Sequence, residues 1–579
     1  MKVEPKKRKR TAKSLTKLIK KTRPGRVKWR KLKHNGPMFP PKYKPLPRNV
    51  SFKYNNKRFK LNRKAEEVAT LYAKMLKEKY VKNVTFNENF MRDWRETMTS
   101  REQKKITYLE KCNFTEITQH FEKEAEAKKK WSKEKKQREK RKREKLEEKY
   151  AWCMVDGKKQ KIGNYKVEPP GLFRGRGNHP KMGTLKKRIT PNDVTINLST
   201  GCKVPKPSVG GKWREVVHNN TVTWLACWFD DISNTYKYVF LSPSSTLREE
   251  GDIAKFELSR ALHKYSNKIK KDYMKGMKSD CPVYKQTSVA LYFIDRLALR
   301  VGNEKGKDQV DTIGCCSLRK EHINLRKMGR KCVVSFHFLS KDSMEYKNTV
   351  EVEPLVFKAI QELLKGKGPK HKLFDEITPA SLNEHLHTIM EGLSAKVFRT
   401  YNASKVFEEQ LKVFTKKNMN MIEKVRAYEQ ANREVAVLCN HRRMPPKNFD
   451  KRTKQLKMKI GERQKKLKKL RTELDDFRDF KEELPNEKSK RKVAVKQRMI
   501  KACEEQLEKL INTKEKHLLN KHIALSTSKL NYCDPRISVA WCKKYKVHID
   551  RIFTKTQRAK FEWAFQMTKA NFKYLRKDS

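Results

Sequence analysis

The sequence lacks several patterns that would place it in a common functional class. No apolar run approaches the roughly 18 residues of a membrane-spanning helix, so we expect no membrane partner. No GxxxxGK[ST] phosphate loop and no evident cluster of acidic residues for magnesium is present, so we expect neither a nucleotide nor a metal cofactor. The 12 cysteines include no C-x-x-C pair. This spacing indicates neither a disulfide framework nor a zinc site, and it fits a reducing intracellular compartment.

Acidic residues are scarce relative to basic ones. The 579 residues include 140 Lys and Arg but only 66 Asp and Glu, which gives a formal net charge of +74. Such an excess favours a polyanionic partner and predicts binding that weakens strongly with salt, although charge alone specifies no chemistry. The apolar fraction of 36% is low, as expected for a globular core joined to long solvated helices.

The first two thirds of the chain indicate a mixed α+β organisation. Periodicity predicts an amphipathic helix over residues 64–80 and a long, highly charged helix over residues 119–150. Two hairpins are predicted from strand-like runs at Thr221–Trp228 with Tyr236–Leu241, and at Val333–Leu339 with Met344–Val350. The second hairpin places Lys341 at its tip.

Residues 447–520 contain almost no aromatic side chains and many charges. Apolar residues recur there at spacings of three, four and seven, in two series: Leu456, Ile460, Leu467, Leu470, Leu474 and Phe477, then Ile500, Cys503, Leu507 and Leu510. Because Pro485-Asn486 interrupts the repeat, we predict an antiparallel coiled-coil hairpin.

Residues 5–10, PKKRKR, form a compact basic cluster of the kind that serves as a nuclear-localisation signal. The first two dozen residues are poor in acids and carry Ser, Thr and Arg, which is also typical of an organellar leader. The sequence therefore favours the nucleus, including nucleolus and chromatin, with the mitochondrion as the alternative.

The motif SKLNYCDPRI at residues 528–537 closely resembles the active-site motif of eukaryotic type IB DNA topoisomerases. Six further strings resemble the same family in the same order: LFRGRGNHPKMG (172–183), ALYFIDRLALRVGNEK (290–305), DTIGCCSLR (311–319), FLSKDS (338–343), AKVFRTYNAS (395–404) and LCNHRRMPPK (438–447). The resemblance runs from about Val27 to near the C-terminus. It implies an enzyme that relaxes supercoiled duplex DNA by cutting and resealing one strand without ATP, in DNA replication and chromosome segregation.

The resemblance also implies roles for five residues. Tyr532 would attack the phosphate to give a 3′-phosphotyrosyl link. Arg300, Arg399 and His441 would bond the non-bridging oxygens, and Lys341 would protonate the leaving 5′ oxygen. No divalent metal is then required, because these groups do what a metal does in other nucleic-acid enzymes.

Four further residues are implied to lie against DNA. Arg176 and Lys181 belong to the Gly-rich loop, where glycines let backbone amides approach phosphates closely. Asn531 lies beside the nucleophile and is expected to help position it, and Asp342 follows Lys341.

The implied architecture is a two-lobed clamp around duplex DNA, acting as a monomer, with chromatin proteins as further partners. Its divisions are a basic tail (1–26), a mixed β and helical cap (27–245), a mainly helical catalytic part (246–446), the coiled-coil linker (447–520) and a small helical C-terminal domain (521–579). Two alternatives stay open. A tyrosine recombinase shares the Arg-Lys-Arg-His-Tyr set, and a catalytically idle, chromatin-binding relative would keep the clamp but not the chemistry.

Overall fold

The structure, a computed structural model, describes residues 25–306, 308–479 and 487–575, with only the backbone for 477–479 and 487–490. Its contacts divide the chain into two compact units. Unit 1 comprises residues up to Ala290, Val301–Val397 and Ile549–Lys569, and unit 2 comprises Leu291–Arg300, Phe398–His548 and the segment from Ala570. Both strands and helices are well represented, which confirms the α+β class.

Unit 1 contains several small sheets. The strand orders are β1-β5-β6, β3-β2-β4, β7-β8, β10-β9-β11-β12 and β13-β14-β15. The strands are β1 (Leu32–His34), β2 (Phe52–Tyr54), β3 (Lys57–Phe59), β4 (Cys112–Asn113), β5 (Trp152–Val155), β6 (Lys158–Lys161), β7 (Gly171–Leu172), β8 (Leu185–Lys186), β9 (Thr195–Asn197), β10 (Glu215–Val217), β11 (Trp224–Asp230), β12 (Thr235–Phe240), β13 (Ile323–Met328), β14 (Lys331–Ser340) and β15 (Met344–Val352).

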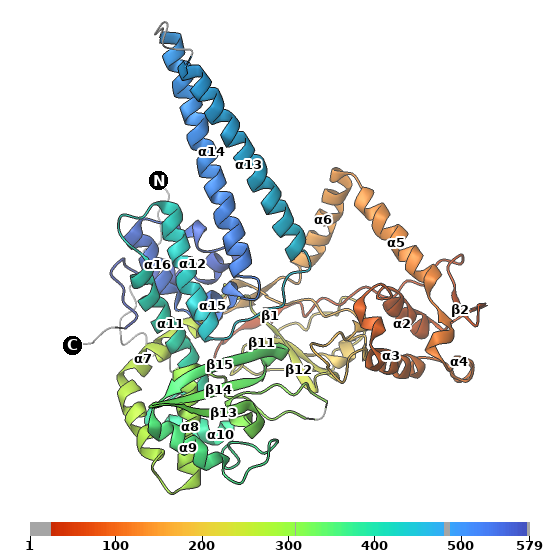
Figure 1. Cartoon of the computed structure of the whole chain (residues 1–579). Coiled ribbons are helices and arrows are strands. Elements are labelled where there is room, and N and C mark those ends of the chain that lie inside the picture. The colour runs from red at the N-terminus through yellow and green to blue at the C-terminus, as the bar shows by residue number, and fades with distance from the viewer. Residues whose placement is uncertain (1–24, 307, 480–486, 576–579) are drawn as a thin grey trace. The chain divides into compact units, whose positions relative to one another are not determined.

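The helices of unit 1 precede, separate and follow these sheets (Figure 1). They are α2 (Arg63–Ala73), α3 (Val84–Glu96), α4 (Ser100–Lys105), α5 (Thr115–Lys130), α6 (Lys133–Glu148), α7 (Thr246–Gly276), α9 (Pro354–Leu364), α10 (Pro379–Ile389), α17 (Lys555–Lys560) and α18 (Glu562–Met567), with short 3₁₀ turns at Lys79–Lys82, Leu109–Lys111, Pro191–Asp193, Cys315–Ser317, Lys320–His322, Lys341–Ser343 and Ile549–Arg551.

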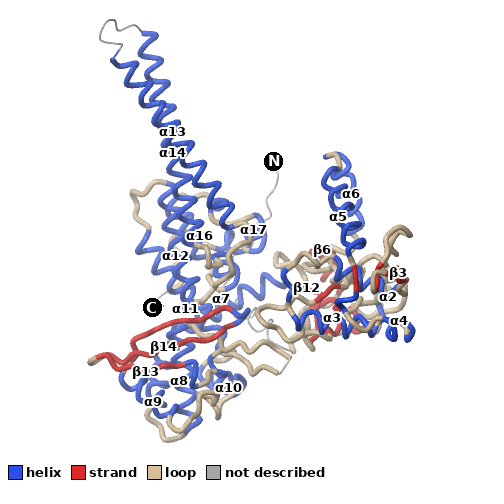
Figure 2. Tube along the Cα trace, turned by 45° about the vertical axis from the view of Figure 1, so that its right-hand side comes forward, coloured by secondary structure: helices blue, strands red, loops and turns tan. Residues whose placement is uncertain are grey.

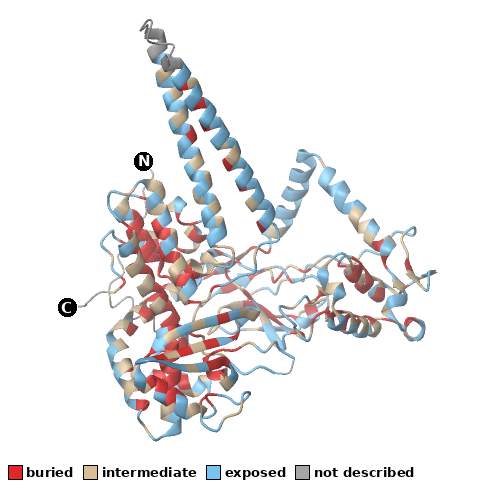
Figure 3. Ribbon diagram, in the orientation of Figure 1, coloured by how far each residue is buried: buried red, intermediate tan, exposed pale blue. Residues whose placement is uncertain are grey.

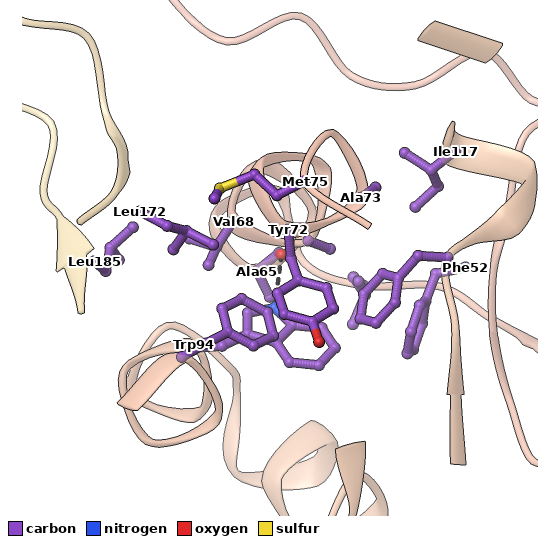
Figure 4. Packing of buried hydrophobic residues seen from close by; sticks show 14 of the residues in the cluster. Phe52, Ala65, Val68, Tyr72, Ala73, Met75, Trp94, Ile117, Leu172 and Leu185 are labelled. Carbon is purple, nitrogen blue, oxygen red and sulfur yellow. Dashed lines mark hydrogen bonds between the residues drawn. The ribbon is translucent and has the colours of Figure 1, made fainter. Parts of the chain in front are cut away.

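One core of unit 1 is built from aromatic side chains of β2, α2 and α3 (Figure 4). The rings of Tyr72 and Phe90 stack with centroids 4.1 Å apart, and Trp94 stacks on Phe90 at 5.3 Å. The indole N–H of Trp94 donates to the Ala65 carbonyl at 2.9 Å, which satisfies the one polar group of this buried ring. A second core lies under β1, β5, β9, β11 and β12.

Both predicted hairpins are present. β11 and β12 pair antiparallel, with the first strand beginning at Trp224 rather than Thr221. β14 and β15 pair from Cys332 with Val352 to Ser340 with Met344, which confirms that Lys341 lies at the tip.

Two helix predictions were wrong in their extent. The helix predicted over 64–80 ends at Ala73. Residues 74–77 form turns in which Met75 packs into the buried core, and a 3₁₀ segment follows at Lys79–Lys82. The helix predicted over 119–150 is two helices. Ser132 accepts from the Lys135 amide and caps a new helix, while Trp131 takes non-helical dihedral angles. A serine cap offers the backbone an alternative partner and so breaks a helix that periodicity alone continues.

Unit 2 is helical. It holds most of α11 (Ala395–Phe414), the end of α8 (Pro282–Leu297), and α12 (Met421–Leu438), α13 (Phe449–Asp479), α14 (Glu487–Leu519), α15 (Leu525–Asn531) and α16 (Pro535–Tyr545). Figure 3 shows buried residues concentrated along α11, α12 and α16, whereas α13 and α14 are mostly exposed.

α13 and α14 run side by side, as Figures 1 and 2 both show, and form the predicted coiled-coil hairpin. Leu467, Leu470 and Cys503 bury their side chains in the seam, with Ile500 and Leu507 packed against them. The Pro485-Asn486 turn and the Phe477 side chain lie outside the described residues. The five-part division and the two-lobed clamp stay predictions.

Candidate active site

Tyr532 lies in a three-residue break between α15 and α16. Asp534 caps α16 by accepting from the Arg536 amide at 2.9 Å, and Pro535 takes the first helical position, where its missing N–H costs nothing. The Asp534 carboxylate also binds the Arg536 guanidinium, with the shortest N–O distance 2.6 Å, and both side chains are buried. The sequence DPR, which begins two residues after Tyr532, therefore starts α16.

Ser404, on α11, fixes the backbone of this break. Its buried hydroxyl donates to the Tyr532 carbonyl at 3.1 Å and accepts from the Asp534 amide at 3.0 Å. The Tyr532 amide in turn donates to the Ser528 carbonyl at 3.0 Å. The main chain on both sides of the Tyr532 side chain is thus held by hydrogen bonds.

Two arginines from distant segments meet the Tyr532 side chain. Arg300 donates from Nη1 to the phenol oxygen at 2.9 Å. The Arg399 guanidinium carbon lies 5.0 Å from the centre of the Tyr532 ring. Two cations therefore flank one phenol group.

Arg399 is itself held by main-chain carbonyl groups. It donates to the Ala298 carbonyl and, at 3.0 Å, to the Cys439 carbonyl, and only 5% of the residue is exposed. Ala298 follows the last residue of α8 and takes a left-handed conformation with φ of 50°. This conformation costs roughly 1–2 kcal/mol for an L-residue, and it accompanies a carbonyl group directed at Arg399.

His441 is the third group against the phenol. Its ring centre lies 5.0 Å from that of Tyr532, and Nδ1 is 2.8 Å from the Ser528 hydroxyl. Burial, reinforced by the charges of Arg399 and Arg300, lowers the pKa of His441 to about 3, so the imidazole is neutral at pH 7. If the Ser528 hydroxyl donates to Nδ1, the ring proton is on Nε2, which then acts as a donor.

The same charges act on the phenol of Tyr532. Burial raises the pKa of Tyr532, but the positive charges of Arg399 and Arg300 and the hydrogen bond from Arg300 outweigh it, so the pKa lies below its usual value. The phenol of Tyr532 therefore ionises more easily in the folded chain than that of free tyrosine, which is a weak nucleophile.

Two buried nitrogen atoms in this group have no hydrogen-bond partner among the described residues: Arg399 Nε, which is a donor, and His441 Nε2, which is a donor when Nδ1 accepts from Ser528. An unpaired buried donor costs about 1–3 kcal/mol, so the pair indicates a ligand that brings acceptor oxygens. Together with Arg300 they suit an anion that carries several oxygens, such as a phosphate diester. No group of three or more His, Cys, Asp or Glu side chains is arranged to hold a metal ion within the described parts of the chain.

Lys341 belongs to unit 1, so the predicted five-residue set is divided between the two units. It is exposed at the tip of the β14–β15 hairpin, where Asp342 and Ser343 are both left-handed, with φ of 70° and 56°. Asp342 forms an ion pair with Arg176, and both are exposed. A Cβ atom on Gly177 would lie 2.8 Å from the Ser343 hydroxyl, so glycine permits this close approach of the Gly-rich loop to the hairpin.

The Gly-rich loop and the hairpin line one open cavity of about 780 Å³, with Arg176, His179, Lys341 and Asp342 among its residues. Lys181 lies on the same loop, where its ammonium group binds Asp308 at 3.0 Å and the Ile232 carbonyl at 3.0 Å. Asn531 is the exposed last residue of α15, directly before Tyr532. Unit 1 thus brings Arg176, Lys341 and Asp342 together, and unit 2 brings Arg300, Arg399, His441 and Tyr532 together.

Sequence reasoning did not single out the residues that hold these groups. Ser404 and Ser528 each end or begin one of the quoted strings, AKVFRTYNAS and SKLNYCDPRI, but a serine alone carries no signal. The Ala298 and Cys439 carbonyl groups are main-chain atoms and leave no mark on residue type.

Comparison with known families covers nearly the whole chain. The family model for the eukaryotic DNA topoisomerase I DNA binding fragment matches residues 27–241, and that for the eukaryotic DNA topoisomerase I catalytic core matches residues 244–474. A third, the C-terminal topoisomerase domain, matches residues 504–574.

Several curated proteins are similar over the same extent. DNA topoisomerase 1 of Homo sapiens is 48% identical over 95% of this chain and 72% of its own length. The mitochondrial DNA topoisomerase I of Rattus norvegicus is 46% identical over 95% of this chain and 93% of its own length. DNA topoisomerase 1 of Drosophila melanogaster is 47% identical, with 95% of this chain and 55% of its own length covered.

Proposed function

The chain belongs to the eukaryotic DNA topoisomerase I family and is a type IB DNA topoisomerase that acts on DNA, and from this premise we propose that Tyr532 is its nucleophile. The observation that carries the proposal is the hydrogen bond from Arg300 to the phenol oxygen at 2.9 Å, within a group of buried donors that lack partners among the described residues. This family membership sets the recombinase aside. The idle relative is disfavoured because the five positions implied for catalysis, listed here together, hold the expected residue types: Arg300, Lys341, Arg399, His441 and Tyr532.

In the proposed cleavage step, Tyr532 Oη forms a bond to the scissile phosphorus and the bond from phosphorus to the 5′ oxygen breaks. The phenol proton leaves to solvent, and the lowered pKa of Tyr532 makes this loss easier. Lys341 Nζ supplies a proton to the departing 5′ oxygen. The product is a 3′-phosphotyrosyl ester and a free 5′ hydroxyl.

The non-bridging oxygens gain negative charge during this step. We assign Arg300, Arg399 and His441 as the donors that bind them, because Arg399 Nε and His441 Nε2 are buried and have no hydrogen-bond partner among the described residues. The assignment places the proton of the neutral His441 ring on Nε2 and makes Nδ1 the acceptor for Ser528. Preorganised donors of this kind contribute typically 10²- to 10³-fold each to the rate. Resealing is the reverse: the 5′ hydroxyl attacks phosphorus, Tyr532 leaves, and Lys341 recovers its proton. Neither cleavage nor resealing consumes ATP in this scheme, and we propose that no divalent metal is needed.

Unit 1 supplies the proposed further contacts to DNA. Arg176 and Asp342 form an ion pair beside Lys341, and Lys181 lies on the same Gly-rich loop. We assign Arg176, Lys181 and Asp342 to contacts with DNA next to the cut. Asn531, in unit 2, is assigned to a contact with DNA and to positioning Tyr532. The proposed substrate is supercoiled duplex DNA and the proposed working form is a monomer, with chromatin proteins as further partners.

Relatives of this chain include enzymes named as mitochondrial. We propose residence in the nucleus on the basis of the basic cluster at residues 5–10, with the mitochondrion as the alternative. A fluorescent fusion of the full chain, compared with one in which residues 6–10 are replaced by alanine, distinguishes the two locations.

The test of the chemistry is relaxation of supercoiled plasmid without ATP or magnesium. Wild type is expected to relax the plasmid and, when trapped with denaturant, to be found linked to a 3′ phosphate. Tyr532→Phe should lose both. Tyr545→Phe, on the neighbouring α16, is the matched control and should keep both. Relaxation by Tyr532→Phe, or a 5′-linked adduct, would overturn the assignment.

A further inference from the structure

One face of the β11–β12 hairpin carries a row of exposed aromatic side chains. Phe229, Tyr236 and Tyr238 are 40%, 48% and 37% exposed, and Trp224 and Phe240 are half-buried. The ring centres follow one another at 5.4 Å from Phe229 to Tyr236, 6.3 Å from Tyr236 to Tyr238, and 5.9 Å from Tyr238 to Phe240. Trp224 lies 6.0 Å from Tyr238. We call these five residues the aromatic row.

The strand register explains why these rings share one face. Phe229 is opposite Tyr236, and Trp224 is opposite Phe240, with an irregularity after Trp224 that keeps the latter pair in line. Alternate residues such as Trp228 and Val239 point to the other face, where they join the buried core. The aromatic row is therefore the outer layer of a sheet whose inner layer already supplies the packing.

The exposed rings of the aromatic row contribute little to the stability of the fold. Cross-strand aromatic pairs do stabilise sheets, but rings kept in contact with water gain little from burial. Contiguous exposed aromatic surface more often marks a site of interaction.

The edge of the hairpin argues against addition of a peptide strand. The Asn164 side chain donates to the Tyr238 carbonyl at 2.8 Å and accepts from the Phe240 amide at 2.8 Å, as a neighbouring strand would. The outer edge of β12 is thus occupied at these positions, and the face of the sheet is the available surface.

Positive charge lies at one end of the aromatic row. The Arg248 guanidinium carbon is 4.7 Å from the centre of the Phe240 ring. β12 is followed by Leu241, which forms a bridge with Ile162 at the end of β6, and β6 carries the exposed Lys158, Lys159 and Lys161. Stacked rings that lead to a cluster of cations have the chemistry that recognises unpaired bases joined by phosphates.

We propose that the aromatic row is a binding site for single-stranded nucleic acid. Two or three successive bases stack on Phe229, Tyr236 and Tyr238, and the phosphates extend toward Arg248 and the lysines of β6. Stacking on aromatic side chains multiplies affinity by roughly 5- to 150-fold per base. The site would hold the unpaired segments that underwound DNA exposes, and it acts independently of Tyr532.

The test measures binding of a fluorescent (dT)12 oligonucleotide to the full-length protein in the presence of saturating duplex DNA. The comparison ligand is an abasic oligomer of equal length, which has the same phosphates but no bases to stack. Wild type should bind (dT)12 at least tenfold more tightly than the abasic oligomer. The triple variant Phe229→Ala/Tyr236→Ala/Tyr238→Ala should bind the two equally.

Two controls keep this test decisive. Tyr108→Ala removes a ring of unit 1 that is 59% exposed but lies outside the aromatic row, and it should keep the wild-type preference. The folding of the triple variant is checked by thermal unfolding, and Tyr236→Phe/Tyr238→Phe, which keeps the rings, should retain the preference. Crosslinking of an oligonucleotide that carries 5-iodouracil should map to Tyr236 or Tyr238.

Equal binding of the two oligomers by wild type would overturn the proposal, as would a preference that survives in the triple variant. A change in sedimentation with no change in oligonucleotide binding would also overturn it, because the aromatic row would then join two copies of the chain. A parallel titration with (rU)12 distinguishes the sources: tighter binding of (dT)12 assigns DNA, and equal or tighter binding of (rU)12 extends the site to RNA.

Discussion

The residues proposed for catalysis lie in two very different environments. Around Tyr532 the side chains are largely buried and the main chain is fixed by Ser404, Ser528 and the Asp534–Arg536 pair. Around Lys341 the side chains are exposed at a hairpin tip. The tip contacts the Gly-rich loop through the Arg176–Asp342 ion pair and the close approach of Gly177. The folded chain therefore already holds the groups around Tyr532 in position, whereas few contacts of the folded chain hold the Lys341 side chain. Changes in the first should alter both stability and rate, and changes in the second should alter rate alone.

The largest effect that sharpens this contrast is expected at Lys341. Lys341→Ala should slow DNA cleavage by about 10²- to 10⁴-fold, because the 5′ oxygen then leaves without a proton donor. The thermal midpoint should stay at the wild-type value, since the side chain is exposed. Single-turnover cleavage of a suicide oligonucleotide measures the rate.

A substrate with sulfur in place of the bridging 5′ oxygen isolates the role of this lysine. A thiolate leaves without protonation, so Lys341→Ala should cleave the sulfur substrate at nearly the wild-type rate. If the variant is as slow on sulfur as on oxygen, Lys341 is not the proton donor.

The second prediction concerns Arg399, in the buried environment. Arg399→Ala should slow cleavage by about 10²- to 10³-fold, and the sulfur substrate should give no rescue, because the lost group acts on the non-bridging oxygens. It should also lower the free energy of unfolding by about 1–3 kcal/mol, since the Ala298 and Cys439 carbonyl groups lose their donor. Denaturant titration measures this loss.

The matched control for stability is Arg176→Ala. This arginine is paired but exposed, so its loss should change the free energy of unfolding by less than about 0.5 kcal/mol. Equal losses in the two variants would remove the proposed difference between the environments.

The same difference explains what the sequence predicts and what it does not. Tyr532, Arg300, Arg399 and His441 were identifiable from the strings around them, and the hairpin that carries Lys341 was identifiable from alternating residues and the short run between them. Ser404 was not, because it acts through two main-chain groups more than a hundred residues away. Local pattern indicates elements and residue types, whereas the partners of a main-chain carbonyl group depend on the tertiary fold.

The break between α5 and α6 shows that local pattern can also miss where a helix ends. Periodicity continues through Trp131, but the Ser132 hydroxyl competes for the Lys135 amide and starts a second helix. The heptad pattern of α13 and α14, in contrast, predicted their seam correctly because Leu467, Leu470 and Cys503 contact one another along it. A pattern is reliable where its residues pack against one another.

A third prediction uses pH. The pKa of His441 is lowered to about 3 in the folded chain, against a usual 6.5, so the unfolded chain binds a proton that the folded chain does not. Stability from this group is present above pH 6.5 and is lost as the pH falls toward 3. Between pH 7.5 and 5 the wild type should lose roughly 1–2 kcal/mol more than His441→Gln.

His337→Gln is the control for this measurement, because His337 lies exposed on the hairpin that carries Lys341. It should show the wild-type loss between the two pH values. The buried His34, whose pKa is lowered to about 4, contributes equally to all three proteins and cancels in the comparison. Identical pH dependence in wild type and His441→Gln would mean that His441 is not held neutral.

The last prediction compares two serines, one in each environment. The buried Ser404 hydroxyl donates to the Tyr532 carbonyl and accepts from the Asp534 amide. In the hairpin, the half-buried Ser340 hydroxyl donates to the Met344 carbonyl at 2.8 Å. Ser404→Ala should lower the free energy of unfolding by about 1–3 kcal/mol, because a buried amide loses its acceptor. Ser340→Ala should cost less than about 1 kcal/mol, because water can replace the hydroxyl. Denaturant titration of both variants, with single-turnover cleavage for Ser404→Ala, tests whether the backbone around Tyr532 is set by folding. A Ser404→Ala enzyme with unchanged stability and unchanged cleavage would show that the Tyr532 segment holds its position without this hydroxyl.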